Sequence, residues 1–320
     1  MSPGGCPATS PRARLAIRVT GLVASVLLAA GVTLAASAPS SVASSARTTL
    51  TAATTAAATP AAAGPSGVQA KEAALANAAT GRILWSRDLN TERPMASITK
   101  VMTALVVIRA GDLSREITVP SAVIGYVDTY GASSAGLHPG DTLTAGQLLN
   151  ALILPSGADA AYTLAEAYGP GLGAFIAKMN ATVRALGLGR THFSNFDGLP
   201  YPTGYSTYST PVDLIRIGLA AMKSAVFRSV VDRRSYRVRP GPGHHAYFWQ
   251  NTNPLLGVYR GAIGIKTGWT PTAGHCLLFE ATRDGHTFIG VNLDSPGVGS
   301  TVNGADATRM LNWAFSLPGY

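Results

Sequence analysis

Ser97-Ile98-Thr99-Lys100 begins a segment whose apolar residues recur at helical spacing as far as Ala110. The pattern follows Pro94 and predicts a helix that starts near Ser97. Residues three apart on a helix share one face, so Ser97 and Lys100 are expected to lie one turn apart. An unprotonated lysine in that place can accept the proton of the serine hydroxyl, which turns a weak nucleophile into a useful one.

Two neighbouring features favour a catalytic pair over a helix-start serine and a surface lysine. Ser97 stands at the expected helix start, where free backbone N–H groups and the helix dipole favour developing negative charge. Lys100 is followed by Val101 and Met102, so its stem is expected to be buried. Burial disfavours the charged ammonium and favours a lysine that acts as a base. Because S-x-x-K recurs by chance, the interpretation needs further motifs.

A second motif, Gly264-Ile265-Lys266-Thr267-Gly268-Trp269, ends an apolar segment that is expected to be a strand. Glycine there lets a substrate backbone lie close to the strand edge. Lys266 offers a fixed positive charge and Thr267 a hydroxyl, a suitable pair for a carboxylate. A second cation near Lys100 would also keep Lys100 neutral. Of the four tryptophans, Trp269 is the one placed to contact a substrate, and the others are expected in the core.

The periodicity along the chain predicts an α+β fold. A hairpin over 69–85 comes first, and helices are expected over 97–110, 144–153, 159–167, 175–186, 211–222 and 305–315. Strands are expected over 235–239, 261–266, 275–282 and 287–292. Such an order is best satisfied by an antiparallel sheet with helices packed on it and a helical subdomain inserted.

Residues 1–38 have the pattern of an export signal. A positively charged start precedes an uncharged apolar run from Val19 to Ala36, and the small residues Ala36-Ser37-Ala38 follow. The run is also long enough to span a membrane, and Pro39 makes cleavage after Ala38 awkward. We therefore expect export, either with a cleaved signal or with membrane attachment through the apolar segment. The protein is then expected in the cell wall or at the outer face of the cytoplasmic membrane.

Residues 39–67 are almost wholly Ala, Ser, Thr, Pro and Gly. Such a segment cannot bury enough apolar surface to offset its ordering entropy, so a flexible linker is expected. About 30 residues of this kind have an r.m.s. reach of roughly 30 Å. The folded domain is then expected to comprise residues 68–320.

Composition excludes several classes of function. The chain has 25 Lys and Arg, of which four precede Gln69, leaving 21 against 16 Asp and Glu in the folded part. That mild excess, in an exported chain without a recognition motif, speaks against nucleic acid. His244-His245 has no neighbouring carboxylate or cysteine at metal-ligand spacing, so neither a metal nor another cofactor is expected. Cys276, the single cysteine after the apolar run, is expected to be a buried thiol.

A third motif, Ser156-Gly157-Ala158, lies between the other two. The three motifs in this order resemble those of penicillin-binding proteins and serine β-lactamases. The sequences around the motifs narrow the resemblance to the low-molecular-weight serine-type D-alanyl-D-alanine carboxypeptidases, peptidase family S11. The similar segments are Leu154-Pro155-Ser156-Gly157-x-Asp159-Ala160-Ala161, Asn251-x-Asn253-x-Leu255-Leu256 and Gly264-Ile265-Lys266-Thr267-Gly268. The resemblance covers about residues 70 to 317. It implies the transpeptidase fold of penicillin-binding proteins and β-lactamases.

The resemblance implies that Lys100 deprotonates Ser97, which attacks the carbonyl between the two terminal D-alanines of a peptidoglycan stem peptide. The backbone N–H groups of Ser97 and Trp269 would hold the oxyanion. Ser156 would relay a proton to the leaving D-alanine. Water then hydrolyses the acyl-enzyme, and β-lactams would acylate Ser97 as covalent inhibitors.

The same resemblance assigns substrate binding to the second motif. Lys266 and Thr267 would hold the substrate carboxylate, with Gly268 and Trp269 completing the edge of the site. An arginine that relatives often use for this carboxylate has its counterpart at Asn303 here. Arg283 and Arg309 are the arginines that could take its place.

Ala158 occupies the position of an asparagine in the resembled family, whose side chain normally contacts the catalytic lysine and the substrate amide. Losing one preorganised donor costs about 10²–10³ in rate. This departure keeps a second hypothesis open, a catalytically weakened peptidoglycan-binding homologue. A third hypothesis, a β-lactamase, needs a glutamate that activates the deacylating water, and Glu166 is the candidate after Ser156.

Overall fold

The computed structural model describes residues 64–297 and 302–320. The expected signal segment and most of the expected linker lie outside these residues, so the domain boundaries at 38 and 67 stay predictions. Within the described part of the chain, no helix has the length and apolar character needed to cross a membrane.

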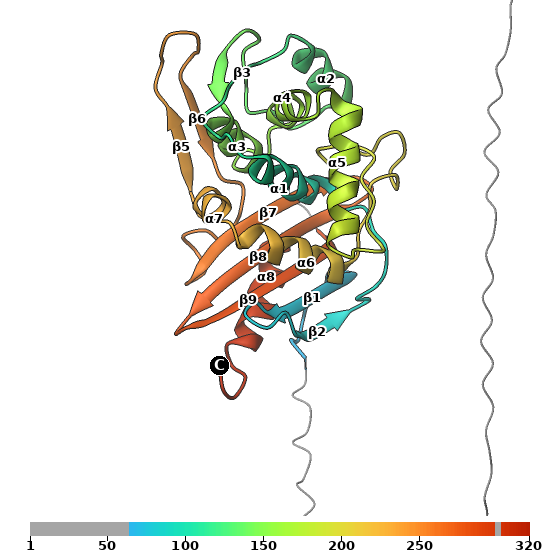
Figure 1. Cartoon of the computed structure of the whole chain (residues 1–320). Helices are drawn as coiled ribbons and strands as arrows, with labels where there is room; N and C mark the ends of the chain where they lie inside the picture. Colours follow the sequence, from blue (N-terminus) through green and yellow to red (C-terminus); the bar gives the residue numbers. More distant parts are fainter. Residues whose placement is uncertain (1–63, 298–301) are drawn as a thin grey trace, which may run out of the picture. The chain divides into compact units, whose positions relative to one another are not determined.

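A five-stranded antiparallel sheet forms the centre of the domain (Figure 1). Its strand order is β2-β1-β9-β8-β7, so the first hairpin joins the last three strands edge to edge. The strands span β1 Glu72–Asn77, β2 Ile83–Arg87, β7 Ala262–Thr270, β8 Gly274–Arg283 and β9 His286–Ser295. The predicted α+β class, with an antiparallel sheet flanked by helices, is confirmed.

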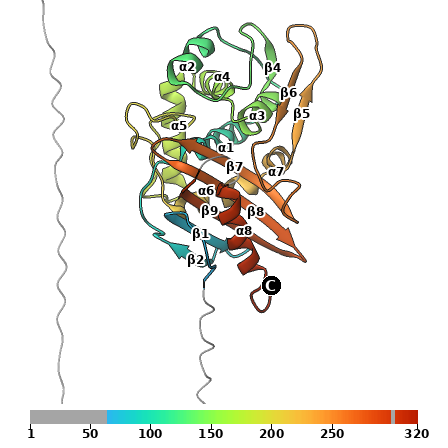
Figure 2. The same ribbon diagram turned by 180° about the vertical axis from the view of Figure 1, so that it is seen from behind.

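Alternation along β1 gives each face of the sheet its own apolar cluster. Ala73 and Leu75 face α8 (Val302–Ala314), which contributes Met310 and Leu311 to the same cluster. Ala74 and Ala76 belong to the larger cluster on the opposite face. That face is covered by α6 (Pro211–Met222), α7 (Ala225–Val231) and α1 (Lys100–Ala110) (Figures 1 and 2). Because both faces are covered, the central strands are apolar on both sides.

A helical subdomain is inserted between β2 and the late strands, as predicted. Its helices are α2 (Ala122–Tyr130), α3 (Ala145–Ile153), α4 (Ala158–Tyr168) and α5 (Leu172–Ala185). Thr144 caps α3 in a capping box with Gln147, so the helix begins where the sequence indicated. Two small sheets accompany these helices, β3 (Glu116–Thr118) with β4 (Thr142–Thr144) and β5 (Ser235–Val238) with β6 (Tyr247–Gln250).

The periodicity missed α2, α7, β3, β4 and β6. Short strands carry too few residues for a visible alternation, and α2 buries Val123 alone, so it has no apolar stripe. The strand expected over 261–266 extends in the structure to Thr270. Its last residues are held as a strand by pairing with β8, from Lys266 opposite Leu278 to Thr270 opposite Gly274.

Gly290 shows how closely the central strands pack. It lies in β9 between Phe279 on β8 and Leu75 on β1. A Cβ at this position would lie 2.2 Å from Phe279 Cζ and 2.8 Å from Leu75 Cδ1. The bare backbone of Gly290 thus makes room for the Phe279 ring.

Gly290→Ala is therefore expected to lower the free energy of unfolding by about 1–3 kcal/mol, the usual cost of overpacking a core. Thermal denaturation followed by circular dichroism measures the effect. Gly173→Ala is the matched control, because a Cβ on this α5 residue meets nothing within 4 Å. Its stability should stay level or rise, since alanine favours a helix. Equal melting temperatures for the two variants would contradict the packing argument.

Candidate active site

Ser97 lies in a short 3₁₀ helix, η1 (Ala96–Thr99), that leads directly into α1. Lys100 begins α1, so the two side chains lie one turn apart, and Lys100 Nζ is 3.0 Å from Ser97 Oγ. Ser97 is half-buried, whereas Lys100 is only 1% exposed. The structure thus places a serine hydroxyl at the surface of a cavity and a lysine amine beneath it.

Burial dominates the electrostatics of Lys100. It lowers the pKa of the Lys100 ammonium, and the carboxylates of Asp197 and Asp159 oppose that shift. Besides Ser97, Nζ donates to the main-chain oxygen of Asp197 at 3.1 Å. Desolvation disfavours the cation, so the neutral amine becomes accessible nearer to physiological pH than in a free lysine. At 3.0 Å, its lone pair is within reach of the Ser97 hydroxyl proton.

Ser156 lies in the turn between α3 and α4 with φ +66, a left-handed conformation that non-glycine residues rarely adopt. Its hydroxyl is buried and has no hydrogen-bond partner among the described residues. The turn is held from outside, because Ser133 Oγ donates to the Ser156 carbonyl at 2.6 Å and Ala158 N donates to the Ser133 carbonyl at 2.8 Å. An unpaired hydroxyl that lines the cavity together with Ser97 is available to a substrate.

The segment after α2, which carries Ser133, is anchored to α4 by Asp159. The Asp159 carboxylate accepts hydrogen bonds from Ser134 Oγ, Ala135 N and Leu137 N at 2.6 to 3.0 Å. These hydrogen bonds hold the carboxylate in one orientation. Asp159 therefore fixes one wall of the cavity to the motif that carries Ser156.

Strand β7 supplies the opposite wall. Lys266 is 1% exposed, and its Nζ donates to the Thr267 carbonyl at 3.0 Å. The Thr267 hydroxyl lies 2.6 Å from the Thr252 hydroxyl, and Thr252 N donates to the Leu154 carbonyl at 3.1 Å. Thr252 therefore ties β7 to the end of α3, across the cavity.

Burial and the nearby Lys100 together lower the pKa of Lys266 well below its ordinary value. This differs from the fixed positive charge expected from the sequence. Two buried amines that share a site disfavour each other's charged form. A bound carboxylate would oppose both effects, so the charge on Lys266 depends on pH and on an anionic ligand.

Gly268 brings β7 against the Ser97 turn. A Cβ on Gly268 would lie 2.9 Å from both Ser97 N and Met95 O. Only a bare backbone permits this approach, which sets Ser97 N–H beside the strand. Trp269 follows, with 58% of its surface exposed at the cavity mouth.

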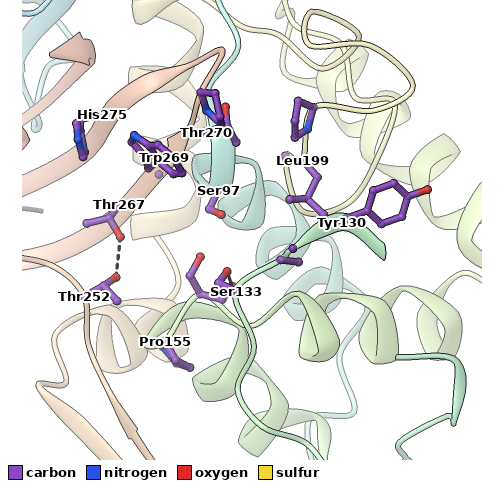
Figure 3. A pocket seen from close by; sticks show the side chains of 17 residues that line it. Ser97, Tyr130, Ser133, Pro155, Leu199, Thr252, Thr267, Trp269, Thr270 and His275 are labelled. Atoms are coloured by element: carbon purple, nitrogen blue, oxygen red, sulfur yellow. Dashed lines mark hydrogen bonds between the residues drawn. The ribbon is translucent and has the colours of Figure 1, made fainter. Parts of the chain in front are cut away.

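These groups meet at one cavity of about 590 Å³. Figure 3 shows Ser97 between Thr267 and Thr252 on one side and Leu199 and Tyr130 on the other. The lining residues come from η1, the α2–α4 region, the 198–200 loop, the segment after β6 that carries Thr252, and β7 with its turn into β8. Ser97, Ser156, Thr267, Gly268 and Trp269 all line this cavity, while Lys100 and Lys266 lie behind it.

Several lining residues were missed in the sequence, among them Thr252, Ser133, Tyr130, Leu199 and His275. Thr252 carried a signal, because it fills the variable position of the Asn251-x-Asn253 motif. The other four stand in segments without a motif. Only the folding of distant segments around Ser97 brings them to the cavity.

The two arginines considered as replacements at Asn303 lie elsewhere, which corrects that expectation. Arg283 stacks over the rings of Tyr259 and Phe315, at 4.1 and 4.6 Å from their centroids. Arg309 pairs with Asp306 on its own helix. Neither lines the cavity. The side chain of Asn303 lies outside what the structure describes.

The remaining sequence candidates also lie away from the cavity. Glu166 is in the second half of α4 and is not among the lining residues. Cys276 is fully buried in β8, as expected, and burial raises the pKa of its thiol to about 12. His245 contacts Asp141 and stacks on His138. Within residues 64–297 and 302–320, no group of three or more potential ligands could hold a metal ion.

A buried lysine that touches a half-buried serine, opposite a strand edge with a second lysine, defines a serine acyl-transfer enzyme. The family model of the S11 peptidases, D-alanyl-D-alanine carboxypeptidases, matches residues 55–297. A D-alanyl-D-alanine carboxypeptidase of Streptomyces sp. strain K15 is 42% identical over 253 residues, 75% of this chain and 85% of that protein. One of Mycobacterium tuberculosis is 36% identical, over 76% and 81% of the two chains.

Solved structures agree with the sequence comparison. The crystal structure of the Streptomyces K15 DD-transpeptidase superposes with a TM-score of 0.74 at 40% identity, over 80% of this chain and all (100%) of that one. A D-alanyl-D-alanine carboxypeptidase of M. tuberculosis superposes with a TM-score of 0.71 at 33% identity, over 82% and 96%. The chain belongs to the S11 family and is a serine-type D-alanyl-D-alanine carboxypeptidase.

Gly268→Ala is expected to slow acylation by a reporter penicillin by about 10²-fold, because a shift of the strand misplaces the groups around Ser97. The rate of covalent labelling measures it. Gly189→Ala serves as the control, since a Cβ at this loop residue meets nothing within 4 Å. If Gly268→Ala labels as fast as the control, the close approach has no role in the site.

Proposed function

We propose that the cavity binds the end of a peptidoglycan stem peptide and that Ser97 attacks the carbonyl between its two terminal D-alanines. The observation that carries this assignment is the 3.0 Å contact of Ser97 Oγ with the amine of Lys100, a side chain only 1% exposed. In its neutral form Lys100 takes the proton from Ser97 Oγ as the new C–O bond forms. The base and the groups that hold the oxyanion thus both lower the free-energy barrier to the attack.

The oxyanion is assigned to the backbone N–H groups of Ser97 and Trp269. This assignment is supported by the packing of Gly268, which brings β7 so near to Ser97 N that a Cβ on Gly268 would lie 2.9 Å from it. Donors fixed before the reaction need no rearrangement when charge develops, so they favour the transition state over the substrate.

Ser156 is assigned the transfer of a proton to the leaving D-alanine amine. In support, its hydroxyl is buried at the cavity wall and has no partner among the described residues. Ser156 Oγ can donate to the leaving nitrogen and accept from the Lys100 ammonium that acylation creates. The C–N bond breaks as this proton arrives, and Lys100 returns to its neutral form.

Binding of the substrate carboxylate is assigned to Thr267 and Lys266, with Thr252 added from the structure. The two hydroxyls, 2.6 Å apart, share a hydrogen bond at the cavity surface, so the hydroxyl that accepts keeps its own proton for a carboxylate, and the Lys266 amine lies behind them. A carboxylate here raises the pKa of Lys266, so binding takes up a proton. The described cavity lining contains no arginine, so the carboxylate-binding role that relatives often give to an arginine is assigned here to the two hydroxyls.

Water is proposed as the acceptor that releases the acyl group. Glu166 lies outside the cavity lining, and the described residues that line the cavity include no glutamate to activate that water as a β-lactamase needs. Slow hydrolysis of a β-lactam adduct follows. From the sequence pattern alone, residues 1–38 are proposed to direct export. They either stay as a membrane attachment or are cleaved, which leaves the domain in the cell wall.

Incubation with a reporter penicillin is expected to add one ligand mass to the parent protein, and Ser97→Ala should abolish the adduct. Intact-mass spectrometry over time measures both the adduct and its lifetime. A long-lived adduct fits the carboxypeptidase, whereas release within seconds would favour the β-lactamase. No adduct on the folded parent protein would refute acyl transfer at Ser97.

Ala158→Asn tests the weakened-homologue hypothesis. If the missing amide limits catalysis, acylation should accelerate by about tenfold or more, since one preorganised donor contributes about 10²–10³. Because Ala158 is fully buried, Ala158→Val controls for added volume without an amide. An Asn variant no faster than the parent, at equal thermal stability, rules the amide out as the limit.

A further inference from the structure

Asp197 lies beneath the catalytic pair although no motif marked it. It belongs to the loop between α5 and α6 and is fully buried, at 0% exposure. Its main-chain oxygen accepts the hydrogen bond from Lys100 Nζ at 3.1 Å. The next residue, Gly198, fixes this approach, because a Cβ there would lie 1.9 Å from Ala96 O. The loop is thus pressed against the turn that carries Ser97.

The Asp197 carboxylate is held by its own set of donors. Tyr126 OH donates to Oδ2 at 2.8 Å, and Leu199 N donates to Oδ1 at 3.2 Å. Tyr126 OH is also 3.0 Å from Tyr201 OH. Hydrogen bonds to the ionised form favour that form, so these contacts oppose the desolvation of the carboxylate. The carboxylate does not line the cavity, so it does not act on a substrate or on water.

The charged groups that face Lys100 come from three elements. Asp197 approaches from the loop, Asp159 from α4 and Lys266 from β7. Two phenols, Tyr126 and Tyr201, surround the Asp197 carboxylate. Asp159 already accepts several hydrogen bonds from the segment after α2. Asp197 is therefore the nearby acid whose carboxylate accepts from fewer donors, namely Tyr126 OH and Leu199 N.

Asp197 and Lys100 influence each other's protonation. Burial raises the pKa of Asp197, and Lys100 is the largest influence that lowers it. In return, Asp197 is the largest influence that raises the pKa of Lys100 against burial. Each group stabilises the charged form of the other, because opposite charges buried in the same part of the protein offset part of the desolvation.

We propose that Asp197 is a positioning residue for the general base. Its main-chain oxygen orients the Lys100 amine toward Ser97, and its carboxylate is the counter-ion of the ammonium that forms when Lys100 takes the Ser97 proton. The inference rests on the proposed acyl transfer at Ser97. The proton moves from Ser97 Oγ to Lys100 Nζ as the Oγ–C bond forms, and it leaves again with the departing amine.

Asp197→Asn tests the counter-ion, because it keeps the main-chain oxygen and the side-chain shape but removes the charge. Loss of a neighbouring anion lowers the pKa of Lys100. The rate of acylation by a reporter penicillin rises with pH as Lys100 deprotonates, so its midpoint should move to lower pH by ~1 unit. The plateau should fall about tenfold, since a weaker base transfers the proton less efficiently.

Tyr126→Phe gives a second test that leaves the Asp197 residue itself unchanged. It removes the donor to Oδ2, which raises the pKa of Asp197 and weakens the counter-ion. The midpoint should move in the same direction by a smaller amount. Asp213→Asn is the matched control: Asp213 is a buried acid, 3% exposed, that accepts from Arg190 N and Thr191 Oγ1 at the start of α6. Its midpoint should stay with the parent.

The outcomes separate the two proposals. A parent protein that is never acylated refutes the acyl transfer itself. A parent that is acylated, with Asp197→Asn and Tyr126→Phe both slower at an unmoved midpoint, overturns the counter-ion and leaves a structural role. If Asp197→Asn does not fold, Tyr126→Phe alone decides, because a midpoint shift supports the proposal and an unmoved midpoint refutes it.

Discussion

The rest of the site depends on the burial of the Lys100 amine. A lysine in water holds its proton far above physiological pH and cannot serve as a base. Here α1 carries Lys100 into the contact between the sheet and the inserted helices, where its side chain is 1% exposed. Desolvation lowers its pKa, and its hydrogen bonds go to Ser97 Oγ and the Asp197 carbonyl. The nucleophile gains its reactivity from this loss of solvent.

Two buried lysines at one site disfavour each other's charged form. Lys266 lies behind Thr267 on β7, and its pKa falls further because Lys100 is near. Neither lysine forms an ion pair within 4.0 Å in the described part of the chain. Burial therefore favours the neutral form of both amines, and an anionic ligand shifts them toward the charged form. Substrate binding and catalysis draw on the same electrostatics.

Most of the fold could be predicted because its long elements carry strong periodicity. α6 begins at Pro211 and ends at Met222 as predicted, since Thr210 and Pro211 are clear start signals. α2 and β6 could not be predicted, because they are short and lack an apolar stripe or a visible alternation. At the site, the three motifs were visible, whereas Ser133, Tyr130 and His275 reach the cavity only through packing.

The sequence alone determined the reacting groups, because the spacing of Ser97 and Lys100 is a local property of one helix turn. It also indicated Thr267, Gly268 and Trp269, which are consecutive in one strand. Only the tertiary structure lowered the pKa values of the two lysines, because the segments that bury Lys100 are distant in sequence. The Asp197 carbonyl that orients Lys100 lies 97 residues away in sequence, and a hydrogen bond across that separation leaves no periodic signal.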